Sequence, residues 1–348
     1  MHFFRNYVTN LFSPRTPAGP FSSLRVALIA DELTRRSLEY ECHIKNVTPK
    51  NYIKVLAEWR PDFLFVESAW QGVNDVWKYQ LASYPDYPNR TNAILKQVID
   101  FARRNNIPTV FWNKEDDVHY DRFISTASLF DRIYTVDQNC IEKYRNDAPY
   151  ADQVGVLMFP VQSLLHHEIV TAAPKSGFSC FVGSYGRHIH QQRRIWQDML
   201  FNAFSPRGLD VYDRNSYRKA EHYRYPALNG LQVRPSVTYR KTANVYRRYR
   251  FNLNVNTIEN SPTMYSRRLI EILAVGGVAI TTPSLAVSQI FSEYCTIVDS
   301  IASINAVLDW TEQEYAFAGE RAHHGAEMIA KQHTWTNRLS QLESDRIF

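Results

Sequence analysis

The stretch FNLNVNTIENSPTMYSRRLIEILAVGGVAITT, residues 251–282, decides the fold of this chain. Its first five residues predict a buried strand, and Tyr265–Val275 has the apolar periodicity of a helix. Two glycines, at 276 and 277, end that helix, and Val278–Thr282 predicts the next strand. A strand, a helix and a second strand in this order indicate a parallel βαβ unit.

The same stretch carries a candidate anion site. Arg267 and Arg268 fall in the first turn of the predicted helix, where the helix dipole disfavours cations. A bound anion such as a diphosphate would remove that conflict. One turn later, Glu271 can accept hydrogen bonds from ribose hydroxyls. We therefore expect a nucleotide at the carboxyl edge of this sheet. The alternative is a surface Arg–Glu pair at helical spacing.

The alternation of strands and helices extends outward from this unit, with a break at His166–Gly177. The sequence thus predicts the α/β class, with two Rossmann-like domains whose parallel sheets face each other across a cleft. We expect an N-terminal arm (1–23), two domains (24–168 and 169–330) and a C-terminal helix (331–348) that packs back on the first domain. Further strands are predicted at Leu24–Asp31, Phe63–Glu67, Ile107–Trp112, Arg132–Val136, Val154–Met158, Phe178–Val182 and Gly208–Tyr212, and helices at Thr91–Asn105 and Gln191–Phe204.

Composition supports this interpretation and excludes several classes. The 348 residues suffice for about two domains, and 45% hydrophobic with 22% charged residues is typical of a globular protein. No apolar run approaches the roughly 20 residues of a membrane-spanning helix, and the first residues lack the pattern of a secretory signal. Four scattered cysteines exclude a metal motif and fit a reducing cytoplasm. The net charge of +5 suits an anionic ligand.

Two more segments could bind phosphate or a polyanion. Gly183 and Ser184 follow a predicted strand and can present backbone N–H groups to phosphate. Arg193 and Arg194 are interpreted as a solvated helix face. Further on, Arg214–Arg250 holds ten Lys or Arg, six Tyr and one acid. That composition fits a nucleic-acid strand or, as we prefer, a basic rim around a nucleotide pocket.

An acidic segment follows a strand of the first half. Glu115, Asp116 and Asp117 lie beside His119, and clustered carboxylates can raise one another's pKa. The segment is interpreted as a catalytic base or acceptor loop, a metal-binding triplet, or a cluster that caps the next helix. The polar residues of Asp31–Glu32 and Glu67–Trp70 also follow strands, where a site of the first half should form, and each group is interpreted as a cap rather than a catalyst.

Taken together, these motifs resemble the CgeB-type (spore maturation protein-like) glycosyltransferases, a family with a predicted GT-B fold. The resemblance runs in the family's order from about residue 24 to 282. It rests on ADELT (30–34), RPDFLFVESAW (60–70), IPTVFWNKED–VH (107–119), FD–IYTVDQNCIEKY (130–144), FVGSY (181–185), GLDVYDR (208–214) and LNVN–SPTMYSRRLIEILAVGG (253–277).

The resemblance implies sugar transfer from a nucleotide donor bound mostly by the C-terminal domain. Glu271 resembles the second Glu of the family's E-x7-E element, which holds the ribose, and Thr263 stands in place of the first. Arg267 and Arg268 resemble diphosphate ligands. The stretch 212–214 lies where the nucleobase is usually held. A second departure is Asp117, where the family tends to have Pro.

The sequence thus predicts a cytoplasmic, metal-independent glycosyltransferase with a UDP-sugar co-substrate and no other cofactor. Its acceptor would be a glycan or a lipid-linked hydroxyl, with peripheral membrane contact. The alternatives are a DNA-modifying enzyme acting on a hydroxymethylated base and an inactive scaffold with a binding role. The expected base is Asp116, with Glu115 or His119. The expected donor-site residues are Gly183, Ser184, Tyr185, Tyr212, Arg214, Asn256, Ser261, Thr263, Arg267, Arg268 and Glu271, with no metal ligand.

Overall fold

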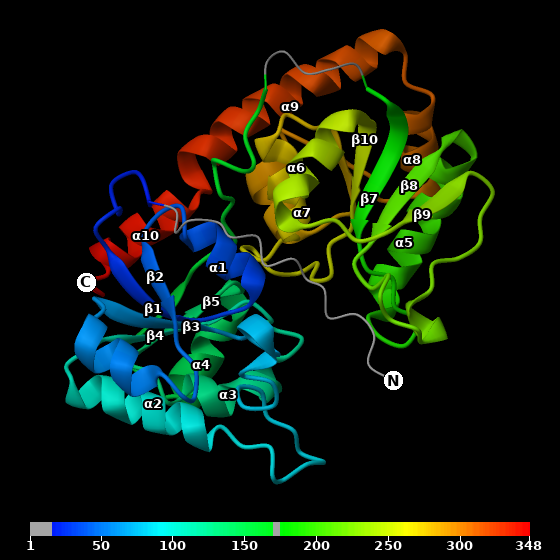
Figure 1. Cartoon of the computed structure of the whole chain (residues 1–348). Coiled ribbons are helices and arrows are strands. Elements are labelled where there is room, and N and C mark those ends of the chain that lie inside the picture. Colours follow the sequence, from blue (N-terminus) through cyan, green and yellow to red (C-terminus); the bar gives the residue numbers. More distant parts are fainter. Residues whose placement is uncertain (1–15, 170–174) are drawn as a thin grey trace, which may run out of the picture.

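The computed structural model describes residues 16–169 and 175–348. They form two α/β domains, the first blue to green and the second green to orange in Figure 1. Most of the expected N-terminal arm, residues 1–15, lies outside the described part. Within the rest of that arm, Phe21 is buried and packs edge-on against Phe348. All four cysteines are buried and free.

The N-terminal domain is built on a six-stranded parallel sheet of order β2-β1-β3-β4-β5-β6. Both β3 and β4 are buried along their whole length, because helices cover both faces of the sheet. The strands are β1 (Arg25–Ile29), β2 (His43–Asn46), β3 (Phe63–Glu67), β4 (Thr109–Asn113), β5 (Arg132–Thr135) and β6 (Gln153–Val156), and the α-helices are α1 (Glu32–Leu38), α2 (Ala93–Arg104), α3 (Tyr120–Ala127) and α4 (Ile141–Asp147).

The C-terminal domain repeats this plan with a parallel sheet of order β12-β11-β10-β7-β8-β9. The helix that opens with the two predicted arginines is α7, and Gly276, at a φ of 67°, follows its end. The strands are β7 (Gly177–Gly183), β8 (Leu209–Asp213), β9 (Leu231–Arg234), β10 (Tyr249–Asn254), β11 (Ala279–Thr281) and β12 (Thr296–Ile297), and the α-helices are α5 (Gln191–Phe204), α6 (Tyr239–Arg248), α7 (Arg267–Ala274) and α8 (Ile301–Leu308).

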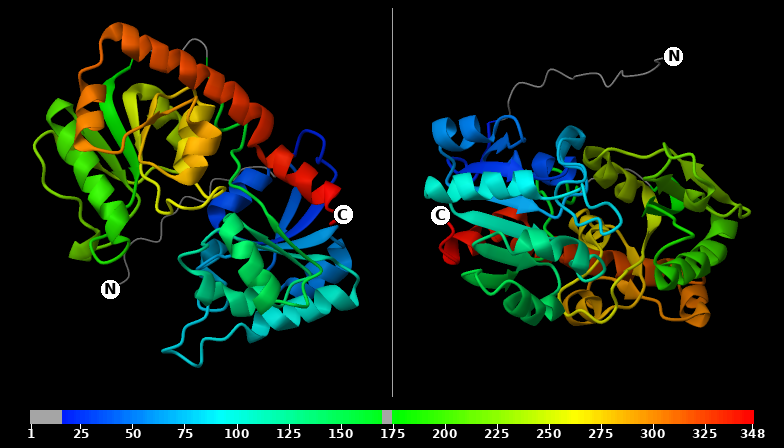
Figure 2. Two further views of the ribbon diagram at one scale, coloured as in Figure 1. Left: turned by 180° about the vertical axis from the view of Figure 1, so that it is seen from behind. Right: turned by 90° about the horizontal axis from the view of Figure 1, so that it is seen from below.

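Two helices at the C-terminal end join the domains. Helix α9 (Glu312–Gln332) packs along the second domain, and α10 (Trp335–Ser344) crosses back to the first (Figure 2). The crossing is tied down by a bridge between Val161 and Thr334 and by a hydrogen bond from Tyr134 to Asp345, at 2.6 Å. The predicted return of the C-terminal helix is therefore confirmed. None of the helices among the described residues is long and apolar enough to span a bilayer.

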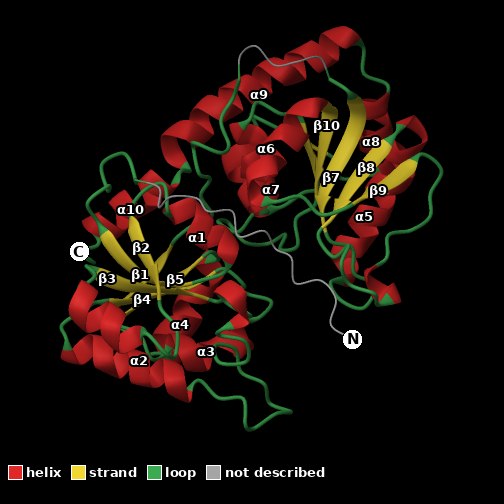
Figure 3. Ribbon diagram, in the orientation of Figure 1, coloured by secondary structure: helices red, strands yellow, loops and turns green. Residues whose placement is uncertain are grey.

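Each sheet has one position where the chain reverses its direction of travel across the strands. In the first sheet this switch point lies between β1 and β3, and in the second between β7 and β10 (Figure 3). The loops after the two strands leave toward opposite faces there and open a crevice in which ligands of such sheets bind.

Candidate active site

Arg268 occupies the switch point of the C-terminal sheet. Its Nε donates to the carbonyl of Val182 on β7, and its Nη1 donates to Oδ1 of Asn254 on β10, at 3.2 Å. The guanidinium also stacks 4.2 Å from the centre of the Phe181 ring. Burial lowers the pKa of Arg268. These contacts fix the position of the guanidinium between β7 and β10.

Three more arginines surround Arg268. Burial lowers the pKa of Arg193 to about 10, and the charges of Arg268 and Arg214 add to the shift. Desolvation, followed by the charge of Arg267, lowers the pKa of Arg214. The residue as a whole is nevertheless exposed to solvent. Arg193 Nε is buried without a hydrogen-bond partner among the described residues. Four cations that repel one another indicate a site for a multiply charged anion.

One carboxylate belongs to this cluster. Glu271 is buried, and its Oε1 lies 3.2 Å from Nε of Arg267, the pair that helical spacing predicts. Its Oε2 accepts a hydrogen bond from the Tyr246 hydroxyl of α6, also at 3.2 Å. The Arg–Glu pair expected as a surface alternative thus exists, but its carboxylate is held inside the domain.

Beside the arginines, the residues that follow the carboxyl end of β7 form one wall of a pocket. A Cβ on Gly183 would lie 2.6 Å from Arg268 Nη2, so only glycine lets the arginine approach. The Tyr185 hydroxyl donates to Asp198, and Gln197 donates to the carbonyl of Ser184. The pocket is lined by Ser184, Tyr185, Gly186, Ile189, His190, Arg193, Gln197, Asn215 and Tyr223.

The other predicted donor-site residues lie elsewhere. Asn256 is buried, accepts from the backbone N–H of Ser266 and donates to the carbonyl of Thr282. It therefore fixes the start of α7 rather than lining the pocket described above. Tyr212 is half-buried, and its hydroxyl bonds to that of Tyr249 at 2.9 Å.

Ser261 and Thr263 connect the two domains. The Ser261 hydroxyl donates to Asp137 Oδ1 at 2.6 Å. The Thr263 hydroxyl donates to the carbonyl of Val136 and accepts from the N–H of Gln138. Their predicted contact with the nucleotide stays a prediction, and the contacts present are interdomain ones.

On the N-terminal side, Asp116 is fully buried. Its two oxygens accept hydrogen bonds from Asn113, Thr135 and Tyr144 at 2.7 to 3.0 Å. Burial raises the pKa of Asp116 to about 7, against the opposing effect of the Thr135 and Tyr144 bonds. The predicted base is therefore enclosed by its own domain.

Glu115 and His119 are more accessible. The Glu115 carboxylate has no hydrogen bond or ion pair with a described residue, and its charge raises the pKa of Arg214, which burial otherwise lowers. The His119 ring lies 5.1 Å from that of Trp70 and 6.4 Å from that of His190, across the domain boundary. This segment thus faces the arginine cluster.

The two other interpretations of the acidic segment find no support. No trio of His, Cys, Asp or Glu side chains within residues 16–169 and 175–348 is placed to hold a metal ion. His119 is the N-cap residue of α3, and no side chain at that position caps the helix.

The sequence interpretation missed Arg193. The sequence predicts a solvated face for it, yet Arg193 lines the pocket, its Nε is buried, and the charge of Arg268 lowers its pKa. A signal was present, because Gln197, Leu200 and Phe204 continue from Arg193 at helical spacing and are buried. Tyr246 and His190 were missed as well, and their roles depend on neighbours far along the chain.

Comparisons with known proteins agree with this geometry. Residues 178–344 match a family model described as glycosyl transferase-like. No curated protein matches the chain. The CgeB-type resemblance therefore stays a prediction.

Solved structures match over nearly the whole chain. Sucrose-phosphate synthase from Thermosynechococcus elongatus is 11% identical, with a TM-score of 0.55 over 93% of this chain and 98% of that one. An α-glucosyltransferase in complex with UDP and a 13-mer DNA is 10% identical, with a TM-score of 0.63 over 93% and 99%. Anabaena HepE in complex with UDP and glucose is 10% identical, with a TM-score of 0.54 over 92% and 90%. The chain therefore has the two-domain GT-B fold, and together with the family match this supports a glycosyltransferase.

Proposed function

We propose that this protein transfers a glycosyl group from a nucleoside-diphosphate sugar to a hydroxyl acceptor. The observation that carries the proposal is the convergence of four arginines at the β7–β10 switch point with one carboxylate among them. A diphosphate supplies the negative charge that this cluster lacks. The UDP bound to HepE and to the α-glucosyltransferase supports uridine as the nucleoside.

The arginines would act on the leaving group. When the bond between the anomeric carbon and the diphosphate oxygen breaks, negative charge grows on that oxygen. Arg268 and its neighbours are already fixed around the site, so they stabilise this charge without reorganising. Fixed cations can do this without a divalent metal, so we expect EDTA to leave the activity unchanged. Glu271, held by Arg267 and Tyr246, would accept hydrogen bonds from the ribose.

The base would come from the N-terminal domain. Of the three residues predicted for this role, Asp116 is enclosed, whereas the carboxylate of Glu115 forms no hydrogen bond or ion pair with a described residue and its charge acts on Arg214. We therefore assign the deprotonation of the acceptor hydroxyl to Glu115, with His119 beside it.

Nucleic acid is a second candidate acceptor. The loops before α5 and after β8 are joined by a hydrogen bond from the N–H of Arg187 to the carbonyl of His222. Six cations on these loops and in the first turn of α5 form no ion pair within the described part of the chain, and the α-glucosyltransferase noted above is bound to DNA. The six are Arg187, Arg194, Arg214, Arg218, Lys219 and Arg224.

Calorimetric titration with UDP, GDP and ADP, with and without EDTA, tests the donor site. We expect UDP to bind the wild type, and Arg268→Ala to weaken binding by about 10- to 100-fold, the value of one or two charge-assisted hydrogen bonds. Arg207→Ala is the matched control, because Arg207 pairs with Asp309 away from the site. Absence of nucleotide binding in the wild type would refute the proposal.

Turnover separates an enzyme from an inactive scaffold. We expect Glu115→Gln to lower the rate of sugar transfer by about 100-fold, a typical contribution of a general base, with the dissociation constant of UDP unchanged. UDP binding without hydrolysis or transfer of a UDP-sugar would instead indicate a scaffold.

A further inference from the structure

Asp31 was expected to cap α1, and it does not. Its carboxylate forms no capping hydrogen bond. Instead, Oδ1 accepts from the N–H of Gly72 at 3.0 Å, and Oδ2 lies 3.3 Å from Nζ of Lys114. About a third of the side chain is exposed. A carboxylate held by two donors and still open to solvent is suited to bind a ligand hydroxyl.

Lys114 is held between two carboxylates. Its Nζ donates to Oε1 of Glu67 at 2.9 Å as well as to Asp31, and Glu67 is fully buried. Burial acts to lower the pKa of Lys114, but Glu67 and Asp31 outweigh burial and raise it, so the ammonium stays charged. An ammonium has three N–H donors. The third has no acceptor among the described residues, and 12% of the side chain is exposed.

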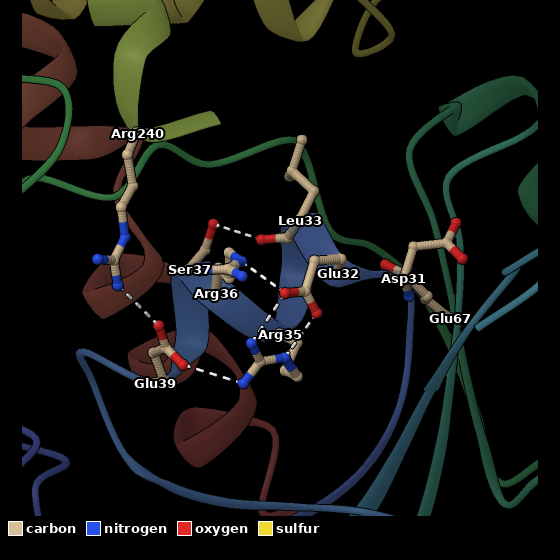
Figure 4. A network of polar contacts seen from close by, with 9 residues as sticks. All are labelled: Asp31, Glu32, Leu33, Arg35, Arg36, Ser37, Glu39, Glu67 and Arg240. Carbon is tan, nitrogen blue, oxygen red and sulfur yellow. Dashed lines mark hydrogen bonds and ion pairs between the residues drawn. The ribbon is translucent and has the colours of Figure 1, made fainter. Parts of the chain in front are cut away.

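This pair lies at the switch point of the N-terminal sheet. Asp31 and Lys114 follow β1 and β4, and Glu67 is the last residue of β3; the carboxyl ends of these strands share one edge. Figure 4 shows Asp31 and Glu67 at the start of α1, apart from the Glu32, Arg35, Arg36 and Glu39 contacts along the helix. The charge of Glu115, the next residue after Lys114, raises the pKa of Arg214 in the other domain.

We propose that Asp31 and Lys114 form an acceptor subsite for a saccharide, in which they bind two neighbouring hydroxyls of one sugar ring. One hydroxyl donates to Asp31, and the other accepts the unused N–H of Lys114. This inference rests on the proposed glycosyltransferase function and names its acceptor class.

The charge of the subsite favours a neutral sugar over a nucleic acid. Asp31 and Glu67 carry two negative charges against one positive charge on Lys114, so the group disfavours a phosphodiester. The half-buried Trp70 follows β3 on the same edge, and its ring packs against those of His119 and Phe123. The unpaired cations lie in the other domain, beside the donor pocket.

Saturation-transfer NMR with methyl pyranosides of the gluco, galacto and manno series tests the subsite without a donor. We expect at least one to bind the wild type and Asp31→Asn to weaken that binding by about 10-fold or more. Glu32→Gln is the matched control, since Glu32 is next to Asp31 in the chain but its carboxylate pairs with Arg35 and Arg36 on α1. Lack of binding by all three pyranosides, or equal binding by Asp31→Asn, would overturn the inference.

Transfer assays give a second readout. With the bound pyranoside as acceptor, the KM of its monodeoxy analogues should exceed that of the parent in the wild type, and Asp31→Asn should abolish part of this preference. UDP binding and the slow hydrolysis of UDP-sugar should be unchanged in this variant. Transfer to an oligonucleotide but to no pyranoside would contradict the saccharide subsite while leaving the glycosyltransferase function intact. Loss of UDP binding in the wild type would instead refute the proposed function.

Discussion

The Thr263 hydroxyl accepts a hydrogen bond from the backbone N–H of Gln138, at 2.8 Å, across the boundary between the two domains. It also donates to the carbonyl of Val136, at 2.9 Å. The family resemblance implies a donor-site Glu at this position. The structure gives the position a different task here, because a short hydroxyl joins the second domain to the end of β5.

Thr263→Val keeps the shape of the side chain and removes both interdomain bonds. We expect the free energy of unfolding to fall by about 1–2 kcal/mol, measured by urea denaturation, with little change in UDP affinity. Thr91→Val is the control, since Thr91 is exposed and its hydroxyl has no partner in the described part of the chain. A tenfold loss of UDP affinity at unchanged stability would instead make Thr263 a nucleotide ligand.

Asp116 makes the stability depend on pH. Burial raises its pKa from an ordinary value of 3.8 to about 7. Between these values the unfolded chain has lost the proton and the folded chain still holds it, so stability falls as the pH rises from about 4 to 7. Asp116→Asn should flatten this decline in denaturation curves recorded at pH 4.5, 5.5 and 7. An unchanged dependence of stability on pH would show that Asp116 is ionised in the folded protein over this whole pH range. Asp86→Asn is the control, because Asp86 is exposed.

Gly183→Ala tests the approach of Arg268 to β7. The added Cβ would lie 2.6 Å from Arg268 Nη2 and 2.6 Å from a ring atom of Phe181, so the guanidinium has to move. We expect UDP affinity to fall by about 10-fold, the value of one charge-assisted hydrogen bond. Gly319→Ala on α9 meets no atom within 4 Å and should leave UDP affinity unchanged. Equal affinities for the two variants would place the donor away from Arg268.

Tyr246 positions Glu271 through a single hydrogen bond. Tyr246→Phe should therefore reduce the preference for UDP over 2′-deoxy-UDP, because a displaced carboxylate no longer accepts the hydrogen bond of the ribose 2′-hydroxyl. A loss of about three- to tenfold in that ratio is expected when one hydrogen bond to the carboxylate is weakened, measured by calorimetry. Tyr294→Phe, whose hydroxyl forms no bond within residues 16–169 and 175–348, is the control. A purely structural role would weaken both nucleotides equally.

Much of the fold follows from local sequence. The apolar runs FLFV and TVFW predict β3 and β4, because a strand buried on both faces needs unbroken apolar side chains. Strands β2 (HIKN) and β9 (LQVR) were missed, since they are short edge strands with half-polar patterns. Helix α6 was not among the predicted helices, yet Thr242, Ala243, Val245 and Tyr246 give it a buried face.

The site was predictable only where one element carries it. Arg267, Arg268 and Glu271 share α7, so helical spacing and the helix dipole were sufficient. Asp31 and Lys114 are 83 residues apart, and their pairing depends on the order of the strands in the sheet. For Asp116 the sequence shows a carboxylate after a strand, but its enclosure comes from Thr135 and Tyr144 on later elements.

The position of α10 constrains how the protein is made. Its segment supplies Trp335, Leu339 and Leu342 to the core that includes Trp112, and Phe348 stacks on Phe63 at 5.3 Å. The N-terminal domain therefore leaves the ribosome long before the helix that covers it is synthesised. The apolar surface that α10 covers stays exposed while the whole second domain is translated. Premature termination within α10 would destabilise the N-terminal domain, although that domain is synthesised first.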